Sequence, residues 1–373
     1  MRGTKASAAP EPSGSRAAPS PSASDTGRLA GSAPLPAGRP RADAGGKPMF
    51  SGILTTLLTP FDGAEIDESA FAALVDWQLA EGVDGLATST IAGEGPTLSP
   101  AERYRLCRIA VEVSARRVPV LAATGTNGTA ATIELTRAAR AAGASAAILV
   151  APYYNKPSQE GIFRHVEAVA RAVDLPLIVE NVPTRTNSVI APSTIERLAR
   201  LPGVVGFVDA AVDPQQMRDN ALACGDRLAT LAPREGAMLV GHRVSGCLSL
   251  AANVAPSLCR DAWEAGFVDP RASAERPSPA THLRELYRAL DLESEPIAAK
   301  YALSLLWPGF DPQPRLPLAP AREETCAQIR VALSRLSAAL DAMPPEADGD
   351  ASARRRPLSV AAPDAARSAV PPS

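Results

Sequence analysis

Short apolar runs alternate with longer amphipathic segments through the middle of the chain. The apolar runs are typical of buried parallel strands, and the run at Val204–Val208 is β-branched. There are eight of them: Ile53–Leu58, Gly85–Thr88, Val118–Ala123, Ala146–Ala151, Leu177–Val179, Val204–Val208, Ala229–Leu231 and Gly246–Leu250. Helical spacing marks the segments between them: Glu68–Glu81, Pro100–Ser114, Thr129–Ala142, Gln159–Val173, Pro192–Leu201, Pro214–Ala223 and roughly Glu235–His242. Eight strands that alternate with helices predict an α/β fold, the (β/α)8 TIM barrel.

More helical segments follow the eighth strand than a barrel needs. A helix over Pro256–Ala265 completes the predicted barrel, and three further segments predict a C-terminal helical extension: His282–Leu290, Pro296–Leu306 and Ala321–Ala342. A doubly wound open sheet is the alternative, but no GxGxxG motif follows the first strand. We therefore expect a barrel over residues 49–270 and the helical extension over residues 271–343.

The two ends of the chain lack this pattern. Residues 1–48 and 344–373 are rich in Ala, Pro and Ser and hold few large apolar residues, so we predict disordered tails. The N-terminal tail contains arginines and few acids, which leaves two alternatives open. Besides a plain disordered tail, these are an organelle-targeting segment and an untranslated stretch ahead of a start at Met49.

Composition and charge exclude several function classes. The net charge is -2 with no long run of one sign, which argues against nucleic acid as a partner. No stretch of ~18 apolar residues is present, so no membrane span is expected. The five cysteines are scattered without CxxC spacing, which favours reduced thiols in a cytoplasmic protein. The histidines lack ligand spacing, so we predict neither a metal nor another cofactor.

Distinctive motifs lie where the predicted strands end, which is where a barrel of this kind carries its chemistry. The motifs are Gly52–Pro60 (GILTTLLTP), Gly93-Glu94 with Thr97-Leu98, Ala151–Gly161 (APYYNKPSQEG), Glu180–Thr186 (ENVPTRT), Gly246–Asn253 (GCLSLAAN) and Arg315–Pro320 (RLPLAP). From about Met49 to Ala342, the chain resembles the dihydrodipicolinate synthase / N-acetylneuraminate lyase family. YYNKPSQEG and NVPTRT are the specific motifs, and the similarity is closest to the dihydrodipicolinate synthase branch.

This resemblance implies a Schiff-base lyase mechanism on pyruvate. In the family, a lysine at the end of the sixth strand attacks the ketone, and the resulting iminium acts as an electron sink. A tyrosine ending the fifth strand and two hydroxyl residues after the second strand relay protons. An arginine after the fifth strand binds a carboxylate, and a second tyrosine reaches across the subunit interface. Family members are commonly homotetramers of tight dimers, so a homo-oligomer is implied here too.

The chain departs from the family pattern at the reaction centre. Val208 occupies the lysine position, and Glu180 occupies the position of the strand-five tyrosine. The two hydroxyl positions are Ile91 and Ala92. Strand alternation points Asp209 away from the barrel interior if Val208 points inward. None of the four lysines falls at the sixth strand's end: Lys5, Lys47, Lys156 and Lys300.

The residues around that centre are retained. Tyr154 matches the interface tyrosine and Arg185 the carboxylate-binding arginine, while Gly93 and Glu94 match the turn after the second strand. Glu180 is interpreted as a structural ion pair with Arg185 or as a general base, because a carboxylate in an apolar mouth has a raised pKa. Arg185 either binds an acid or pairs internally.

Three functional hypotheses follow from these residues. We favour a degenerate family member that lacks the parent activity and acts as a binding, regulatory or assembly partner, with an active homologue as a candidate hetero-oligomer partner. The alternative is an enzyme with lysine-independent chemistry on a small keto or carboxylic acid, using Glu180 as base and Arg185 as anchor. The third hypothesis is the standard pyruvate-dependent synthase or lyase.

Overall fold

The computed structural model describes residues 50–211, 213–235, 244–264 and 279–341. The two predicted tails lie outside these ranges, as do Lys5, Lys47 and all but the first residue of the helix predicted over Glu235–His242.

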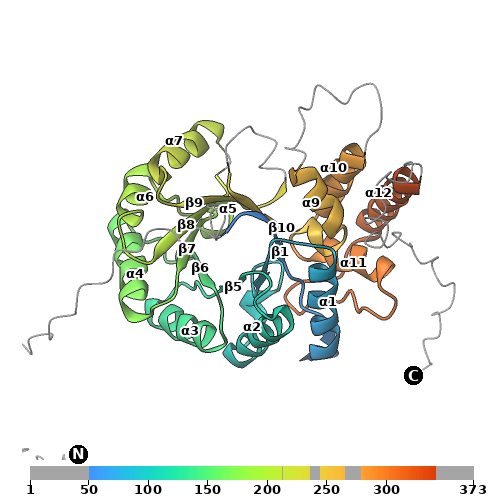
Figure 1. Ribbon diagram of the computed structural model, residues 1–373, viewed down its shortest axis with the longest axis horizontal. Coiled ribbons are helices and arrows are strands. Elements are labelled where there is room, and N and C mark those ends of the chain that lie inside the picture. Colours follow the sequence, from blue (N-terminus) through green and yellow to red (C-terminus); the bar gives the residue numbers. More distant parts are fainter. Residues whose placement is uncertain (1–49, 212, 236–243, 265–278, 342–373) are drawn as a thin grey trace, which may run out of the picture. The chain divides into compact units, whose positions relative to one another are not determined.

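Eight parallel strands close into a barrel (Figure 1). They are β1 (Gly52–Thr56), β4 (Gly85–Thr88), β5 (Val120–Ala123), β6 (Ala146–Val150), β7 (Leu177–Asn181), β8 (Val204–Asp209), β9 (Ala229–Ala232) and β10 (Gly246–Ser249). The order around the barrel is β1-β10-β9-β8-β7-β6-β5-β4. The first and last strands therefore pair directly, with Leu54 opposite Leu248. The predicted (β/α)8 barrel is confirmed.

Helices cover the outside of the barrel, close to the predicted segments. They are α1 (Glu68–Ala80), α2 (Pro100–Ser114), α3 (Thr129–Ala141), α4 (Gln159–Ala172), α6 (Pro192–Leu198), α7 (Pro214–Cys224) and α9 (Pro256–Glu264). The start of α2 shows why sequence locates such a boundary well. Ser99 accepts a hydrogen bond from the Glu102 amide, and the Glu102 carboxylate accepts one from the Ser99 amide. This capping box satisfies two amides that the first turn leaves unpaired.

Five very short elements lie in four loops after strands, and the hydrophobic pattern predicted none of them. They are the hairpin of β2 (Phe61–Asp62) and β3 (Glu65–Ile66), the 3-10 helix η1 (Gly95–Thr97), α5 (Pro183–Thr186) and the 3-10 helix η2 (Ala251–Asn253). Elements of two to four residues are too short to show a periodicity. All four loops follow the C-terminal end of a barrel strand, so they shape the end where a site is expected.

The interior of the barrel is packed with apolar side chains. The inner cluster comprises Phe50, Leu54, Ala87, Leu121, Ala146, Ile148, Ile178, Val208, Leu231 and Leu248. Outward-facing strand residues such as Ile53 and Phe207 pack under the helices instead. A filled interior leaves the strand ends and their loops as the place for chemistry.

Three C-terminal helices pack against one side of the barrel (Figure 1). They are α10 (Pro279–Leu290), α11 (Ile297–Leu306) and α12 (Glu323–Asp341). Their buried residues, Leu286, Leu303 and Leu333 among them, share one cluster with Ile53 of β1. The extension thus has a core in common with the barrel. In the described ranges, each helix is too short or too polar to span a lipid bilayer.

Candidate functional site

The barrel mouth, meaning the C-terminal strand ends and the loops after them, places Glu180 beside Val208. The two residues face each other in the register of β7 and β8. Val208 is fully buried in the inner cluster, and so is Ile178, two residues before Glu180 on β7. Because side chains alternate along a strand, Glu180 continues the inner row at the mouth. One carboxyl therefore stands at the top of an otherwise apolar row.

Asp209 points the other way, toward α7, as the alternation predicts. Its Oδ2 accepts a hydrogen bond from Asn220 of α7 at 3.0 Å. Its Oδ1 accepts from the Asn181 side chain at 3.0 Å and from the Ala211 amide at 3.1 Å. Asp209 and Glu180 consequently form no pair. Across the described residues, His, Cys, Asp and Glu side chains form no group of three or more that could hold a metal.

Glu180 has an unusual protonation equilibrium. Burial raises the pKa of its carboxyl to about 7, with a further increase from the charge of Glu295 and a partial offset from Arg185. The side chain keeps some exposed surface. Both protonation states are therefore populated near neutral pH, which suits a group that accepts and returns a proton.

Arg185 is exposed on α5, and it forms no ion pair with Glu180, although both lie within the described residues. The chain leaves the barrel at Pro183, and the Thr186 hydroxyl donates to the Val182 carbonyl at 3.0 Å, so α5 carries the guanidinium outward. The structural pair between these residues is thus not formed. The Arg185 charge still lowers the pKa of Glu180 and of Glu295, so it acts on the mouth from a short distance.

Sequence reasoning missed three charged residues that join this part of the mouth. Arg234 pairs with Asp291 at 2.6 Å and with Glu295 at 3.0 Å. Glu235 is buried and accepts from the Ser249 hydroxyl and from the Ala251 amide. Burial raises the pKa of Glu235 to about 7, the bond from Ser249 opposes this, and the Glu295 charge adds to it.

These three residues differ in whether the sequence could have identified them as site residues. Arg234 and Glu235 stand two and three residues after the end of β9, so their place near a strand end was visible in the sequence. Glu295 precedes α11 in the extension, 61 residues beyond Arg234, and no local pattern marks it. Arg234, Glu235 and Glu295 line one small cavity together with Tyr287 of α10.

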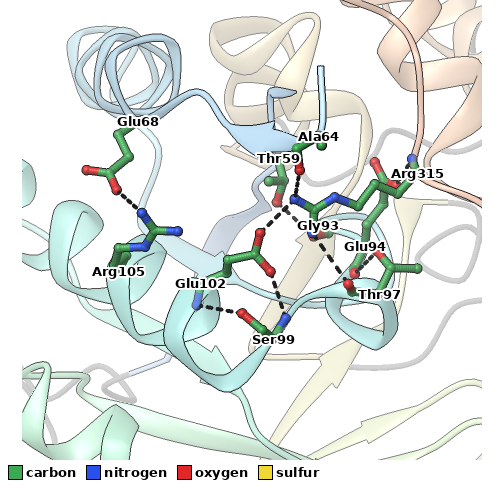
Figure 2. A network of polar contacts seen from close by, with 10 residues as sticks. All are labelled: Thr59, Ala64, Glu68, Gly93, Glu94, Thr97, Ser99, Glu102, Arg105 and Arg315. Carbon is green, nitrogen blue, oxygen red and sulfur yellow. Dashed lines mark hydrogen bonds and ion pairs between the residues drawn. The ribbon is translucent and has the colours of Figure 1, made fainter. Parts of the chain in front are cut away.

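Glu94, expected at the site, instead belongs to a buried network of charges (Figure 2). One carboxylate oxygen lies 2.7 Å from the Lys300 ammonium, and both side chains are fully buried. The other oxygen accepts from the Arg315 amide at 2.7 Å. The Arg315 guanidinium binds Glu102 at 2.6 Å. This bond is the main reason that the pKa of Glu102 falls to about 2.

The rest of the turn after β4 has no free hydroxyl at the two expected positions. Ala92 is buried in the core under the helices, and Ile91 is half-buried. Gly93 is required for steric reasons, because a Cβ there would lie 2.8 Å from the Leu57 carbonyl oxygen. The hydroxyls of Ser89 and Thr90, just upstream, are buried without a hydrogen-bond partner in the described structure.

Tyr154 lies in the loop between β6 and α4 and is 92% exposed. Its backbone is left-handed, with φ at 70°. Lys156 is exposed on the same loop. Within this chain, Tyr154 is therefore not brought to Glu180.

Together these features define a class of protein. A (β/α)8 barrel with a titratable carboxyl and an arginine at one strand end has the architecture of a protein that acts on, or binds, a small molecule at its C-terminal face.

Comparison with known proteins gives the family. The model of the dihydrodipicolinate synthetase family matches residues 49–336. The chain is 41% identical over 288 residues to the 4-hydroxy-tetrahydrodipicolinate synthase of Phenylobacterium zucineum, which covers 77% of this chain and 97% of that protein. Identity to the synthase of Rhodospirillum centenum is 42% over 291 residues, covering 76% of this chain and 98% of that protein. The chain belongs to the dihydrodipicolinate synthetase family.

Comparison with solved structures supports the same family. The dihydrodipicolinate synthase of Thermotoga maritima superposes with a TM-score of 0.71 at 33% identity, covering 77% of this chain and 99% of that one. The chloride-inhibited synthase of Acinetobacter baumannii, complexed with pyruvate, gives a TM-score of 0.70 at 34% identity, covering 77% and 98%.

Proposed function

We propose that this family member does not run the lysine-dependent reaction and that it binds a small keto or carboxylic acid at its barrel mouth through Arg185. One observation carries the proposal. Val208, at the position that the resemblance assigns to the lysine, is a fully buried member of the inner cluster and lies beside Glu180. A valine side chain cannot form an imine.

The two lysines in the described part of the chain do not take the place of the family's lysine. The Lys300 ammonium is 2.7 Å from Glu94 and donates to the Gln313 carbonyl at 3.0 Å. Burial lowers its pKa, and the Glu94 charge opposes this effect. Moving it to the end of β8 would leave Glu94 as an unpaired buried charge. Lys156 stands on an exposed loop.

Arg185 supports acid binding because its guanidinium is exposed and has no acidic partner within ion-pair distance in the described structure. Guanidinium groups bind carboxylates through two parallel hydrogen bonds. The Acinetobacter baumannii relative was solved with pyruvate, itself a small keto acid.

The role we assign is binding, regulation or assembly rather than catalysis. Tyr154, 92% exposed on a strained loop, supports a surface that a second subunit covers. That subunit is another copy of this chain in a dimer or tetramer, or an active homologue that carries the lysine. Co-expression with such a homologue should yield mixed oligomers, and recovery of homo-oligomers alone would contradict the hetero-oligomer.

A second candidate function is lysine-independent catalysis with Glu180 as general base and Arg185 as anchor. The specific observation in its favour is the pKa of Glu180, which burial raises to about 7. A base is most effective when its pKa lies near the working pH. Turnover of a small carboxylic acid that disappears in Glu180→Gln would establish this alternative.

Borohydride reduction with pyruvate, followed by intact mass, tests the main proposal. We expect no adduct on the natural chain. The Val208→Lys variant, or a homologue with lysine at this position, shows that the trap works. A pyruvyl adduct mapped to one barrel lysine of the natural chain would overturn the proposal.

A further inference from the structure

The turn between α10 and α11 carries a carboxyl of the C-terminal extension to the barrel mouth. Arg234, two residues after the end of β9, lies 2.6 Å from Asp291 at the start of this turn and 3.0 Å from Glu295 near its end. The Glu295 side chain is only 12% exposed, whereas those of Arg234 and Asp291 are 41% and 47% exposed. The ion pairs therefore place an acid of the extension at a strand end, largely out of water.

Glu295 joins two other carboxyls along one arc of the mouth. Glu235 directly follows Arg234 and lines the same small cavity as Glu295. Glu180 ends the inner row of β7, which pairs with β8, and β8 in turn pairs with β9. The three carboxyls thus come from β7, from the segment after β9 and from the extension. Among the described residues, Glu295 is the member of this cluster that has an ion-pair partner.

The charge of Glu180 depends on groups outside its own strand. Its neighbours in the sheet are valines of β6 and β8, which carry no charge. The charged groups that act on it are Glu295, which raises the pKa of Glu180 further above the level that burial sets, and Arg185, which lowers it. Glu295 also raises the pKa of Glu235. One acid of the extension therefore disfavours ionisation of both barrel carboxyls, as a like charge does.

Arg234 favours the charged form of Glu295. Burial raises the pKa of Glu295 and the charge of Asp291 adds to the rise, while the charges of Arg234 and then Arg185 oppose it. Without the ion pair to Arg234, the buried Glu295 would more readily take up a proton and lose the charge through which it acts. The guanidinium thus determines both the place and the charge of this carboxyl.

We propose that Glu295, held by Arg234, is a positioning residue that keeps Glu180 neutral and thereby lets the mouth accept an anionic acid. The consequence for binding rests on the proposed function, since an ionised Glu180 repels the carboxylate of an acid. The inference goes further because it gives the C-terminal extension a part in the site.

A carboxyl-carbon NMR titration tests the effect of Glu295 without any ligand. In protein made with isotopically labelled glutamate, the Glu180 resonance is assigned by its absence in Glu180→Gln. In the natural chain, we expect its titration midpoint at a pH of about 7. In Glu295→Gln, the midpoint should fall by about one pH unit, because a nearby like charge has been removed.

Two controls separate the charge of Glu295 from the structure of the turn. Glu293→Gln alters the same turn, but the Glu293 carboxyl pairs with Arg322 and not with Arg234. This matched variant should leave the Glu180 midpoint unchanged. Glu134→Gln, which changes an exposed carboxyl on α3, should leave it unchanged as well. Thermal melts check that each variant is folded.

The pH profile of acid binding tests the consequence. Calorimetric titration with pyruvate between about pH 5 and pH 8 should show an affinity that falls as Glu180 ionises. The fall should begin about one pH unit lower in Glu295→Gln, and Glu293→Gln should keep the profile of the natural chain. A role of Glu295 in stability alone would not move this profile.

The outcomes separate this inference from the proposed function. An unchanged Glu180 midpoint in Glu295→Gln would overturn the inference and leave acid binding standing. An equal shift in Glu293→Gln would also overturn it, because the effect would then come from the turn and not from the charge. If pyruvate binds at no pH, the proposed function fails, while the NMR midpoint still decides whether Glu295 acts on Glu180.

Discussion

Two groups of charges at the barrel mouth use the same residue types and differ in whether those charges are paired. In the network of Glu94, Lys300, Arg315 and Glu102, each charge has an opposite charge within 3 Å. Glu180 and Arg185, on β7 and α5, have no such partner in the described structure. Paired charges around a turn fix its conformation. Arg185 is exposed and Glu180 is half-buried. A half-buried carboxyl without a partner is a candidate contact for a ligand, since an unpaired buried charge is otherwise costly.

The largest effect is expected from breaking the paired group. Lys300→Met leaves Glu94 buried without its cation, and we expect a loss of about 3–5 kcal/mol in the free energy of unfolding, measured by denaturant titration. The double variant with Glu94→Gln should recover part of that loss. Lys156→Met, which removes an exposed ammonium, is the control. A Lys300→Met protein as stable as its parent would show that the network is not structural.

A smaller effect on stability is expected from the unpaired carboxyl of Glu180, and this effect depends on pH. The pKa of Glu180 is about 7 in the folded protein, above its ordinary value of 4.5, so the folded state holds a proton that the unfolded state releases. Its contribution to stability is present below pH 4.5 and is lost as pH rises through 7.

Glu180→Gln cannot ionise and escapes this loss. We expect it to gain on the order of 2 kcal/mol over the natural protein between pH 5 and pH 8, measured by unfolding at both values. Glu134→Gln should follow the natural protein. A constant difference between Glu180→Gln and the natural chain would show that Glu180 is already ionised at pH 5.

The next effect appears in binding rather than in stability. Arg185→Ala removes an exposed side chain without a partner, so the free energy of unfolding should stay within about 0.5 kcal/mol. Affinity for a small carboxylic acid should fall at least about tenfold, measured by calorimetry. An Arg185→Ala variant that loses stability but still binds the acid would show that Arg185 has a structural role and does not contact the ligand.

The smallest effect should come from the surface edge of the paired network. Glu68 and Arg105 lie 2.9 Å apart, with 42% and 40% of their side chains exposed (Figure 2). We expect Arg105→Ala to lower stability by about 0.2–1 kcal/mol, less at high salt. Thermal melts at two salt concentrations measure this. A loss of stability as large as that of Lys300→Met would mean that burial does not determine how much an ion pair contributes to the stability of this protein.

The unpaired group could be found from the sequence, and the paired group could not. Glu180 and Val208 lie in strands that the apolar runs predict, and a period of two residues places Val208 inward and Asp209 outward. Both features are confirmed. The function of these positions stays a prediction.

The partners of the charged residues depend on the closed fold. Lys300 meets Glu94 across 206 residues, and Arg315 bonds Glu102 across 213. Such pairs form only once α11 and the segment after it pack against the barrel, so no local pattern shows them. The sequence left two interpretations open for Glu180, an ion pair with Arg185 or a general base. The two residues are neighbours along the chain, but they form no ion pair in the structure.

Asp209 gives position 208 a further property. Its bonds to Asn181, Ala211 and Asn220 tie the end of β8 to β7 and α7, on the side away from the interior. These bonds hold the strand end from outside the barrel and do not involve the side chain at position 208. We expect a substitution at position 208 to leave them in place. For protein engineering, position 208 is therefore a site at which we expect that a reactive side chain can be introduced without redesign of the barrel.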